Sequence, residues 1–286
     1  MASSKPLPLF DLVRGREVRT VLNNGVSMPV LGLGVWQAPP GRATREAVQL
    51  AIEAGYRLID TAALYRNEAS VGEAVRQSGV RREELFVTTK LWNDDQGEES
   101  ARRAFERSRR LLDLGPVDLY LLHWPVTGKR LASWKVLERL LRDGECRSIG
   151  VSNFTVAHLS ELLDRSGIVP AVNQVEFSPF LFQRDLLEYC RNHGIQLEAY
   201  APLTRGEKLA DPVVVRIAQR HGRSPAQVVL RWGLQHGVVE IPKSIHRERI
   251  VENFASLDFG LAPTEMAALD GLHAGFRTTW DPSGWP

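Results

Sequence analysis

Cysteine is scarce in this sequence. Among 286 residues only Cys146 and Cys190 occur, and their separation matches no metal-binding spacing. Two thiols do not make a disulfide scaffold, so a disulfide-stapled secreted domain is not expected. No metal site is predicted anywhere in the chain.

Long hydrophobic runs are also missing. The first residues lack the unbroken apolar stretch of a secretion signal, and no apolar run approaches the length needed to cross a bilayer. We therefore expect a cytoplasmic protein that has no membrane partner.

Neither sign of charge dominates. The chain has 36 Lys and Arg against 34 Asp and Glu, a formal net charge of only +2. That balance does not support a diffuse electrostatic surface for nucleic acid, so no nucleic-acid partner is expected. The hydrophobic content of 43% is that of an ordinary globular protein.

Glycine-rich phosphate loops and linkers are absent as well. Residues 32–34 read Gly-Leu-Gly, but position 37 is Gln where a dinucleotide-binding fingerprint has its third glycine. No low-complexity tract interrupts the chain, and we expect residues 1–286 to form a single domain.

The chain does contain one repeated pattern, in which a short apolar run is followed by a polar turn and an amphipathic helical segment. It starts after a hairpin-like stretch at residues 19–34, with Asn-Gly at the turn. Eight such units favour a (β/α)8 TIM barrel over a doubly wound sheet. The predicted strands are 30–34, 57–62, 85–90, 117–123, 148–152, 171–176, 196–202 and 238–243. Helices are predicted at 44–55, 68–79, 97–115, 132–144, 155–167, 184–194, 211–222 and 247–258, with extra helices at 224–237 and 264–272.

Three predicted strands end on residues that carry chemistry. The second ends on Asp60, the third on Lys90 and the fourth on His123, and Tyr65 follows Asp60 by five positions. In such a barrel the carboxyl ends of the strands share one rim, so these groups can converge. Asp60 would then neutralise Lys90, and the ammonium would lower the pKa of the Tyr65 phenol.

An ordinary alternative exists for each of these residues, because a polar residue after a strand is usually just the first residue of a loop. Taken together the set is harder to dismiss, since a buried Lys or Asp is costly unless it is paired. A phenol with a lowered pKa would be a proton donor usable near neutral pH.

Three stretches resemble the signatures of the aldo-keto reductase family. They are "GYRLIDTAALYRNEASVG" at 55–72, "RSIGVSNF" at 147–154 and "IPKSIHRERIVEN" at 241–253, and they occur in the order found in that family. Among its subgroups, the chain looks most similar to the bacterial 2,5-diketo-gluconate reductase-like enzymes.

The resemblance implies an oxidoreductase that reduces aldehydes and ketones to alcohols by hydride transfer from NADP(H). The family's catalytic four fall on Asp60, Tyr65, Lys90 and His123. It implies that Tyr65 protonates the carbonyl oxygen as general acid and that His123 orients that oxygen. The expected substrates are small aldehydes and α-keto or diketo compounds, because the connections after His123 and Tyr200 are short.

The resemblance also assigns cofactor residues. The nicotinamide would stack on Tyr200, with its carboxamide held by Ser152, Asn153 and Gln174. The remaining cofactor positions are Leu203, Lys243, Ser244, Arg249, Glu252 and Asn253. Two cations and a hydroxyl beside a helix start suit the 2′-phosphate of NADP(H). The plain alternatives are a core aromatic for Tyr200, strand-end polar groups and a solvated basic turn.

Tryptophan supplies the expected substrate wall. The family match places Trp36, Trp92 and Trp124 near the substrate, whereas Trp280 and Trp285 are candidates by position alone. For any one of them, core filling is an equally good explanation.

Two other functions remain open on the same barrel. One is a cofactor-sensing regulatory subunit, which can keep the four residues, although no partner-docking segment is evident. The other is a phosphate-binding isomerase, which the missing glycine-rich loop near the last strands disfavours. The expected partner is a small carbonyl compound, and the expected state is a monomer.

Overall fold

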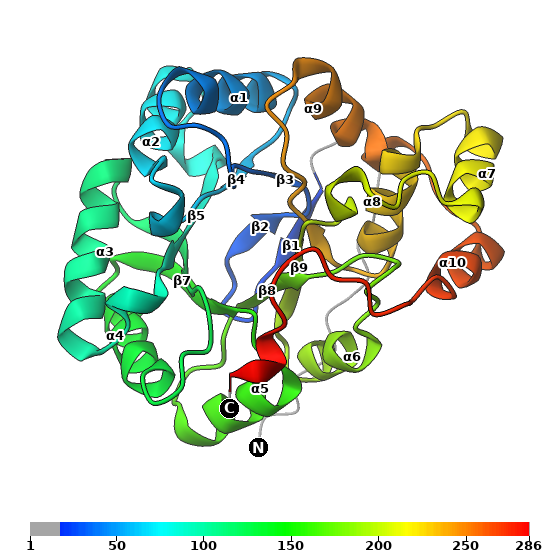
Figure 1. The fold of residues 1–286 in the computed structure, drawn as a ribbon. Coiled ribbons are helices and arrows are strands. Elements are labelled where there is room, and N and C mark those ends of the chain that lie inside the picture. The colour runs from blue at the N-terminus through cyan, green and yellow to red at the C-terminus, as the bar shows by residue number, and fades with distance from the viewer. Residues whose placement is uncertain (1–17, 286) are drawn as a thin grey trace.

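A barrel of parallel strands forms the centre of the molecule. The structure is a computed structural model and describes residues 18–285. Within that range, eight strands pair in chain order, each parallel to the next (Figure 1). The strands are β3 (Gly32–Gly34), β4 (Leu58–Asp60), β5 (Phe86–Leu91), β6 (Val117–Leu122), β7 (Cys146–Ser152), β8 (Val172–Glu176), β9 (Gln196–Tyr200) and β10 (Val239–Glu240). Bridges from Leu31 to Glu240 and from Gly34 to Lys243 join the first strand to the last, which confirms the TIM barrel.

The predicted N-terminal hairpin is present. Strands β1 (Arg19–Val21) and β2 (Ser27–Pro29) pair antiparallel, and Gly25 in the turn has a φ of 84°, which glycine adopts without strain. Leu22 and Met28 pack with Leu58 in the cluster inside the barrel. The hairpin therefore closes one end of the barrel.

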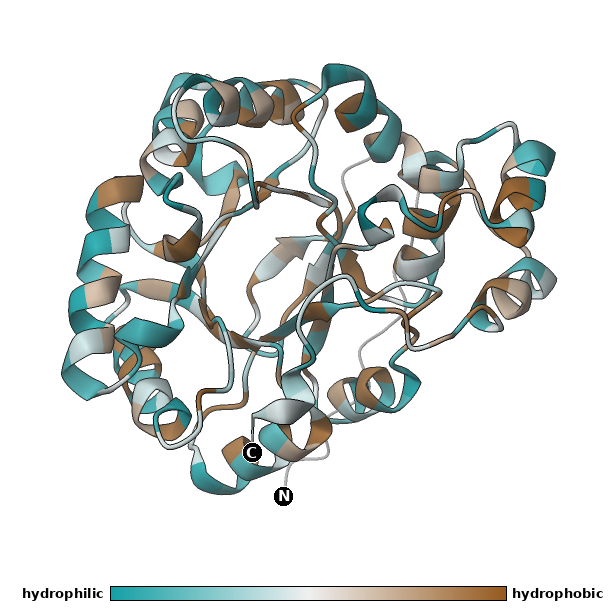
Figure 2. Cartoon of the chain, viewed as in Figure 1, coloured by the Kyte–Doolittle hydropathy of each residue, from teal (hydrophilic) through white to brown (hydrophobic). Residues whose placement is uncertain are grey.

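Helices cover the outside of the barrel. They are α1 (Arg42–Glu53), α2 (Glu68–Gln77), α3 (Glu98–Leu112), α4 (Arg130–Arg142), α5 (Val156–Arg165), α6 (Arg184–Asn192), α7 (Pro212–His221), α8 (Pro225–Gln235), α9 (Arg247–Phe254) and α10 (Pro263–Asp270). In α3, Ala101, Ala104, Phe105 and Leu112 recur at helical spacing and are buried. Figure 2 shows the same division in several helices, which turn hydrophobic surface towards the strands and hydrophilic surface outwards.

Of the two predicted extra helices, the one at 264–272 is present as α10, whereas the one at 224–237 is a barrel helix. The sequence predicts a barrel helix at 211–222 and an extra helix at 224–237. In the structure, α8 packs against β10 and most of its residues are buried, whereas α7 buries only Val214, Ile217 and Ala218. The additional helices are thus α7 and α10, which pack on each other at the periphery (Figure 1). Amphipathic periodicity could not rank the two, because both have an apolar face.

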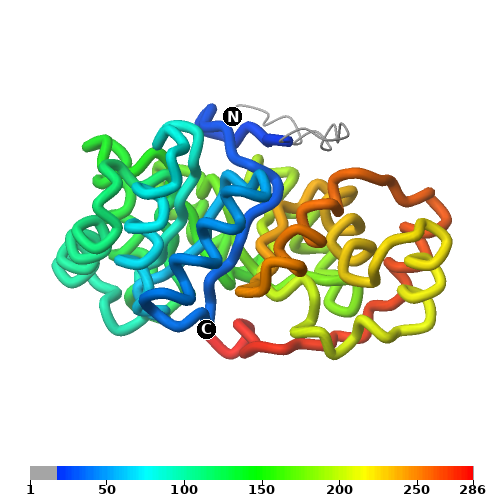
Figure 3. Tube along the Cα trace, turned by 90° about the horizontal axis from the view of Figure 1, so that it is seen from above, coloured from blue at the N-terminus to red at the C-terminus, as the bar shows by residue number. Residues whose placement is uncertain are grey.

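The two ends of the barrel are closed by different parts of the chain. Figure 3 shows the β1–β2 hairpin at one end and the C-terminal segment, residues 276–285, at the other. Across residues 18–285, no helix is long and apolar enough to span a membrane, and no cluster of potential metal ligands occurs.

Candidate active site

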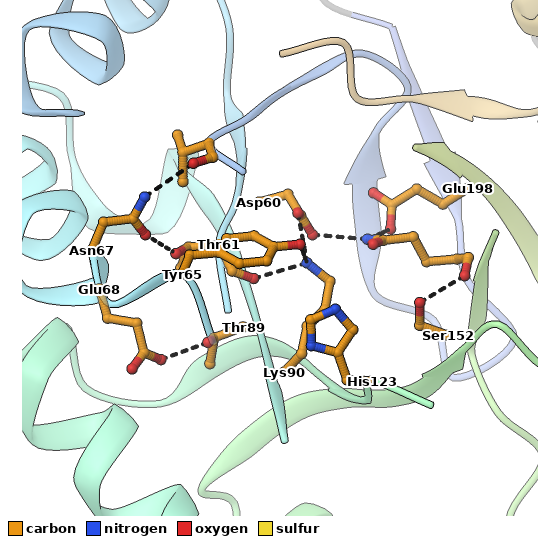
Figure 4. A network of polar contacts seen from close by, with 12 residues as sticks. Asp60, Thr61, Tyr65, Asn67, Glu68, Thr89, Lys90, His123, Ser152 and Glu198 are labelled. Atoms are coloured by element: carbon orange, nitrogen blue, oxygen red, sulfur yellow. Dashed lines mark hydrogen bonds and ion pairs between the residues drawn. The ribbon is translucent and has the colours of Figure 1, made fainter. Parts of the chain in front are cut away.

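The carboxyl ends of neighbouring strands bring three of the sequence-predicted residues together. Asp60 is the last residue of β4, Lys90 lies near the end of β5, and His123 directly follows β6. Because these strands are adjacent and parallel, the side chains meet at the barrel end opposite the hairpin (Figure 4). Tyr65 reaches the same point from the loop after β4.

Lys90 is the centre of this cluster. Its side chain is fully buried, and its ammonium donates to Asp60 Oδ1 at 2.6 Å, to the Thr61 carbonyl oxygen at 2.9 Å and to the Tyr65 hydroxyl at 3.3 Å. These three acceptors use all three N–H groups. Burial opposes the charged form, but Asp60 and Tyr65 outweigh it and raise the pKa of Lys90. The ammonium is therefore a fixed cation beside the phenol.

Local backbone structure places Tyr65. It ends a short 3-10 helix, η1 (Ala63–Tyr65), and Arg66 then takes a left-handed conformation with φ 58°. Asn67 fixes the loop, since it accepts a hydrogen bond from Thr61 Oγ1 at 2.7 Å and donates to the Val35 carbonyl oxygen at 3.0 Å. The loop is thereby tied to both neighbouring strands, which holds the phenol over Lys90.

The expected pKa shift of Tyr65 was wrong in direction. Lys90 does favour the phenolate, but burial is the larger effect and raises the pKa of Tyr65 to about 12. The phenol is therefore fully protonated at neutral pH. A proton donor needs that state, so the Tyr65 hydroxyl is able to donate even though its pKa is raised.

His123 is held as a neutral imidazole. Burial, together with the charge of Lys90, lowers its pKa well below the ordinary value for histidine. Its Nδ1 is buried without a hydrogen-bond partner among the described residues, which leaves Nε2 as the nitrogen available to an incoming ligand. The ring packs edge-on to Tyr65, with centroids 5.8 Å apart.

Two of the three tryptophans predicted for the substrate wall pack directly on this cluster, and the third contacts the C-terminal segment. Trp36 packs on Tyr65 at 4.8 Å between ring centroids, and Trp92 packs edge-on to His123 at 5.2 Å. Trp124 is buried and packs near two tail residues, Trp280 and Trp285, with ring centroids 5.8 and 6.3 Å apart. The tail tryptophans therefore belong to the same aromatic group as Trp124.

The residues predicted to hold a nicotinamide carboxamide lie beside the cluster. Ser152 Oγ donates to the Gln174 carbonyl oxygen at 2.8 Å, and Asn153 Nδ2 donates to the His123 carbonyl oxygen at 2.9 Å. Asn153 has a φ of 64°, which is uncommon outside glycine. Tyr200 donates to Asn153 Oδ1 at 2.7 Å, and Asn153 Nδ2 also donates to Ser152 Oγ at 3.1 Å, so the four predicted positions form one connected set.

Sequence reasoning missed Glu198. This residue is buried in β9, and its Oε2 accepts from Gln174 Nε2 at 2.7 Å, while the same nitrogen donates to Asp60 Oδ2 at 2.8 Å. A signal was available, because strand alternation puts Glu198 on the same face as Tyr200. A carboxylate inside an otherwise apolar strand also needs a partner.

The C-terminal segment is fastened over the same end by Glu176, a second residue that the sequence analysis missed. Its carboxylate, at the end of β8, accepts from the backbone N–H and the hydroxyl of both Thr278 and Thr279, at 2.6 to 3.2 Å. Thr279 Oγ1 also lies 3.0 Å from the Tyr200 hydroxyl. His158 Nε2 contacts the Trp285 carbonyl oxygen and holds the end of the segment.

Two predicted phosphate-binding cations lie at the start of α9 and in the turn before it. Partial burial and the charge of Arg249 lower the pKa of Lys243, which places the two cations near each other. Among residues 18–285 neither forms an ion pair with a carboxylate. Ser244 Oγ accepts from the His246 N–H at 3.1 Å in the same turn. Two adjacent cations without a counter-charge fit an anion such as the adenosine 2′-phosphate.

The remaining predicted cofactor positions differ in their surroundings. Asn253 is buried, Leu203 is partly buried against the core, and the Glu252 carboxylate accepts from the Ser224 hydroxyl. Whether any of them contacts a cofactor stays a prediction.

Known proteins match nearly the whole chain. The model of the Aldo/keto reductase family matches residues 30–274. The glyoxal reductase of Bacillus subtilis (strain 168) is 52% identical over 277 residues, which cover 97% of this chain and 98% of that protein. The morphine 6-dehydrogenase of Pseudomonas putida is 50% identical over 276 residues, which cover 91% and 93%.

Solved structures agree with the sequence matches. An aspartate-to-alanine mutant of Gox0644 in complex with NADPH superposes with a TM-score of 0.89 at 42% identity, covering 94% of this chain and 98% of that one. These matches agree with the barrel and the polar cluster at its end. They also support placement in the 2,5-diketo-gluconate reductase-like subgroup. This chain belongs to the aldo/keto reductase family.

Proposed function

We propose that this protein is an NADPH-dependent reductase of small aldehydes and of α-keto or dicarbonyl compounds. The observation that carries the proposal is the contact of the buried Lys90 ammonium with both Asp60 and the Tyr65 hydroxyl. A relative that shares half of its sequence is named for the reduction of glyoxal, a small dicarbonyl, which supports the substrate class.

The cofactor assignment rests on two cationic side chains that form no ion pair with a described residue. Lys243 and Arg249 lack carboxylate partners among the described residues and suit a 2′-phosphate. The related Gox0644 protein was solved with NADPH, which supports the same choice here. Ser152, Asn153, Gln174 and Tyr200 would hold the nicotinamide end. When bound, NADPH supplies the hydride that reduces the carbonyl carbon.

The residues of the chain supply the proton and the positioning. Tyr65 donates its hydroxyl proton to the carbonyl oxygen, and the resulting phenolate lies 3.3 Å from the Lys90 ammonium, which stabilises it. Asp60 keeps Lys90 charged and in place. Neutral His123 offers Nε2–H to the same oxygen and orients it. Trp36 and Trp92, which pack on Tyr65 and His123, provide aromatic surfaces beside these two groups.

A single substitution tests this assignment. Tyr65→Phe removes the proton donor and keeps the ring, so carbonyl reduction should fall at least by the ~10²–10⁴ typical of a lost general acid. Binding of NADPH to the variant should be unchanged. The assay mixes protein, NADPH and glyoxal and follows the loss of reduced-nicotinamide absorbance.

Tyr120→Phe is the matched control. The Tyr120 hydroxyl is buried in β6 without a hydrogen-bond partner among the described residues, so its removal should leave turnover and stability intact. Near-normal turnover by Tyr65→Phe would remove Tyr65 from its role. Wild-type protein that binds NADPH but reduces no carbonyl compound would favour the cofactor-sensing alternative.

A further inference from the structure

The side-chain amide of Gln174 is held from two sides by carboxyl groups. Its Nε2 has two N–H groups, one of which points to Asp60 Oδ2 at 2.8 Å and the other to Glu198 Oε2 at 2.7 Å. The amide oxygen, Oε1, has no hydrogen bond to a described residue. It is not one of the fully buried atoms that lack a partner, so it remains accessible. The amide nitrogen therefore points towards the two acids, and Oε1 is left for another donor.

Glu198 extends the polar chain by one member. It connects through Gln174 to Asp60, and from there to Lys90 and Tyr65. In the barrel register Glu198 lies opposite Val239, an interior residue, so its side chain is directed into the barrel. Among residues 18–285, the Glu198 carboxyl group has one hydrogen bond, which Oε2 accepts from Gln174, and its Oε1 is buried without a partner.

We infer that Glu198 is a positioning residue, which fixes the Gln174 amide so that its oxygen accepts a hydrogen bond from the carboxamide NH2 of the nicotinamide. The inference rests on the proposed function, because it takes NADPH as the cofactor. It adds a residue that touches neither cofactor nor substrate, and it names the one cofactor group through which that residue acts.

The surroundings of Glu198 favour its neutral form. Burial is the main cause, and together with the charge of Asp60 it raises the pKa of Glu198 to about 8. The charged and titratable groups that bear on it are Asp60 on β4, Tyr65 after β4, Lys90 on β5 and Glu240 on β10. Glutamine at this position is therefore the conservative replacement, because its oxygen can accept from Gln174 as Glu198 Oε2 does.

Two cofactors and three variants test the inference by binding alone. The cofactors are NADP⁺ and its 3-acetylpyridine analogue, in which a methyl group replaces the carboxamide NH2. Glu198→Leu removes the acceptor, so affinity for NADP⁺ should fall by roughly 2- to 10-fold, as expected for one hydrogen bond. Affinity for the analogue should be unchanged, because it has no N–H to lose. Titrations followed by tryptophan fluorescence or calorimetry give both constants.

The other two variants separate positioning from general damage. Glu198→Gln should keep the wild-type preference for NADP⁺ over the analogue. Glu240→Leu is the matched control, because Glu240 is another buried acid on the neighbouring strand, but its carboxyl group lies against Gly233 of α8, outside the barrel. It removes a buried acid that does not contact Gln174, and it should leave the preference for NADP⁺ intact.

The results separate this inference from the proposed function. The role of Glu198 would be overturned if Glu198→Leu weakened binding of both cofactors equally or of neither. It would also be overturned if Glu240→Leu changed the two affinities in the same way as Glu198→Leu. Wild-type protein that binds both cofactors equally would overturn it too. If wild-type protein prefers NADP⁺ to the analogue but reduces no carbonyl compound, only the proposed function is contradicted.

Discussion

At the scale of single residues, the site is a group of buried charges that balance one another. Lys90 alone would be very costly to bury, and Asp60 at 2.6 Å makes its charged form stable. Burial also disfavours the charged form of Tyr65, and there it prevails, because no cation contacts Tyr65 as closely as Asp60 contacts Lys90. A single ammonium at 3.3 Å does not overcome the loss of water around Tyr65, and the pKa therefore rises.

Glu198 gives a prediction about pH and stability. Its pKa is 4.5 in its ordinary state and about 8 when folded, so between these values the folded protein keeps a proton that the unfolded chain loses. The free energy of unfolding then decreases as the pH rises through this interval, and levels off above about 8. Glu198→Gln lacks this titration and should gain stability relative to wild type across the interval.

Thermal melts of both proteins at a series of pH values check this expectation. The melting temperature of Glu198→Gln minus that of wild type should increase up to about pH 8 and then stay constant. Two parallel curves would mean that Glu198 is ionised in the folded protein.

At the scale of structural elements, the C-terminal segment depends on one carboxylate. Glu176 accepts four hydrogen bonds from Thr278 and Thr279, and Trp280 and Trp285 lie against Trp124. Through Thr279 the segment also touches Tyr200, the predicted nicotinamide platform. The covering of the site end is therefore anchored at the end of β8.

Glu176→Gln should loosen this segment. An amide has one acceptor oxygen where the carboxylate has two, so at least one of the two threonines loses its hydrogen bonds. Amide hydrogens of residues 276–285 should exchange faster, as measured by mass spectrometry of peptides from that region. Glu207→Gln changes an exposed acid and serves as control. Unchanged exchange in Glu176→Gln would show that the tryptophan contacts alone hold the segment.

Helix α9 and the turn before it give a prediction about cofactor choice. Lys243→Ala should weaken binding of NADPH by about 10-fold or more, the usual effect of losing a hydrogen bond from a charged group, and should leave binding of NADH unchanged. Arg247→Ala removes a nearby cation that pairs with Glu53 and should affect neither cofactor. Equal weakening of NADPH and NADH by Lys243→Ala would contradict the 2′-phosphate assignment.

At the scale of the whole molecule, one continuous core joins the two halves of the barrel. The main cluster includes Val30 and Val35 near the first strand, Trp134 in α4 and Leu257 near the last helices. We therefore expect residues 18–285 to unfold in one cooperative step. Calorimetry should give a single transition, and two separable transitions would argue for two domains. The expected monomeric state and cytoplasmic location stay predictions.

The sequence by itself determined the local structure and the family. Short apolar runs and turn residues predicted the hairpin and the eight strands, because these depend on neighbours along the chain. The ends of these strands pointed to Asp60, Lys90 and His123, since parallel strands share one rim. The signature stretches then assigned the family, which the comparisons confirm.

Only the tertiary structure decided what depends on contacts between distant residues. Glu198 lies 24 positions from Gln174, and Glu176 lies 102 from Thr278, so no local pattern joins these pairs. Which of α7 and α8 is the barrel helix was likewise decided by contact with β10, which α8 makes. The pKa of Tyr65 depends on how much water the assembled barrel removes, and burial is a property of the packed molecule that the order of residues alone does not reveal.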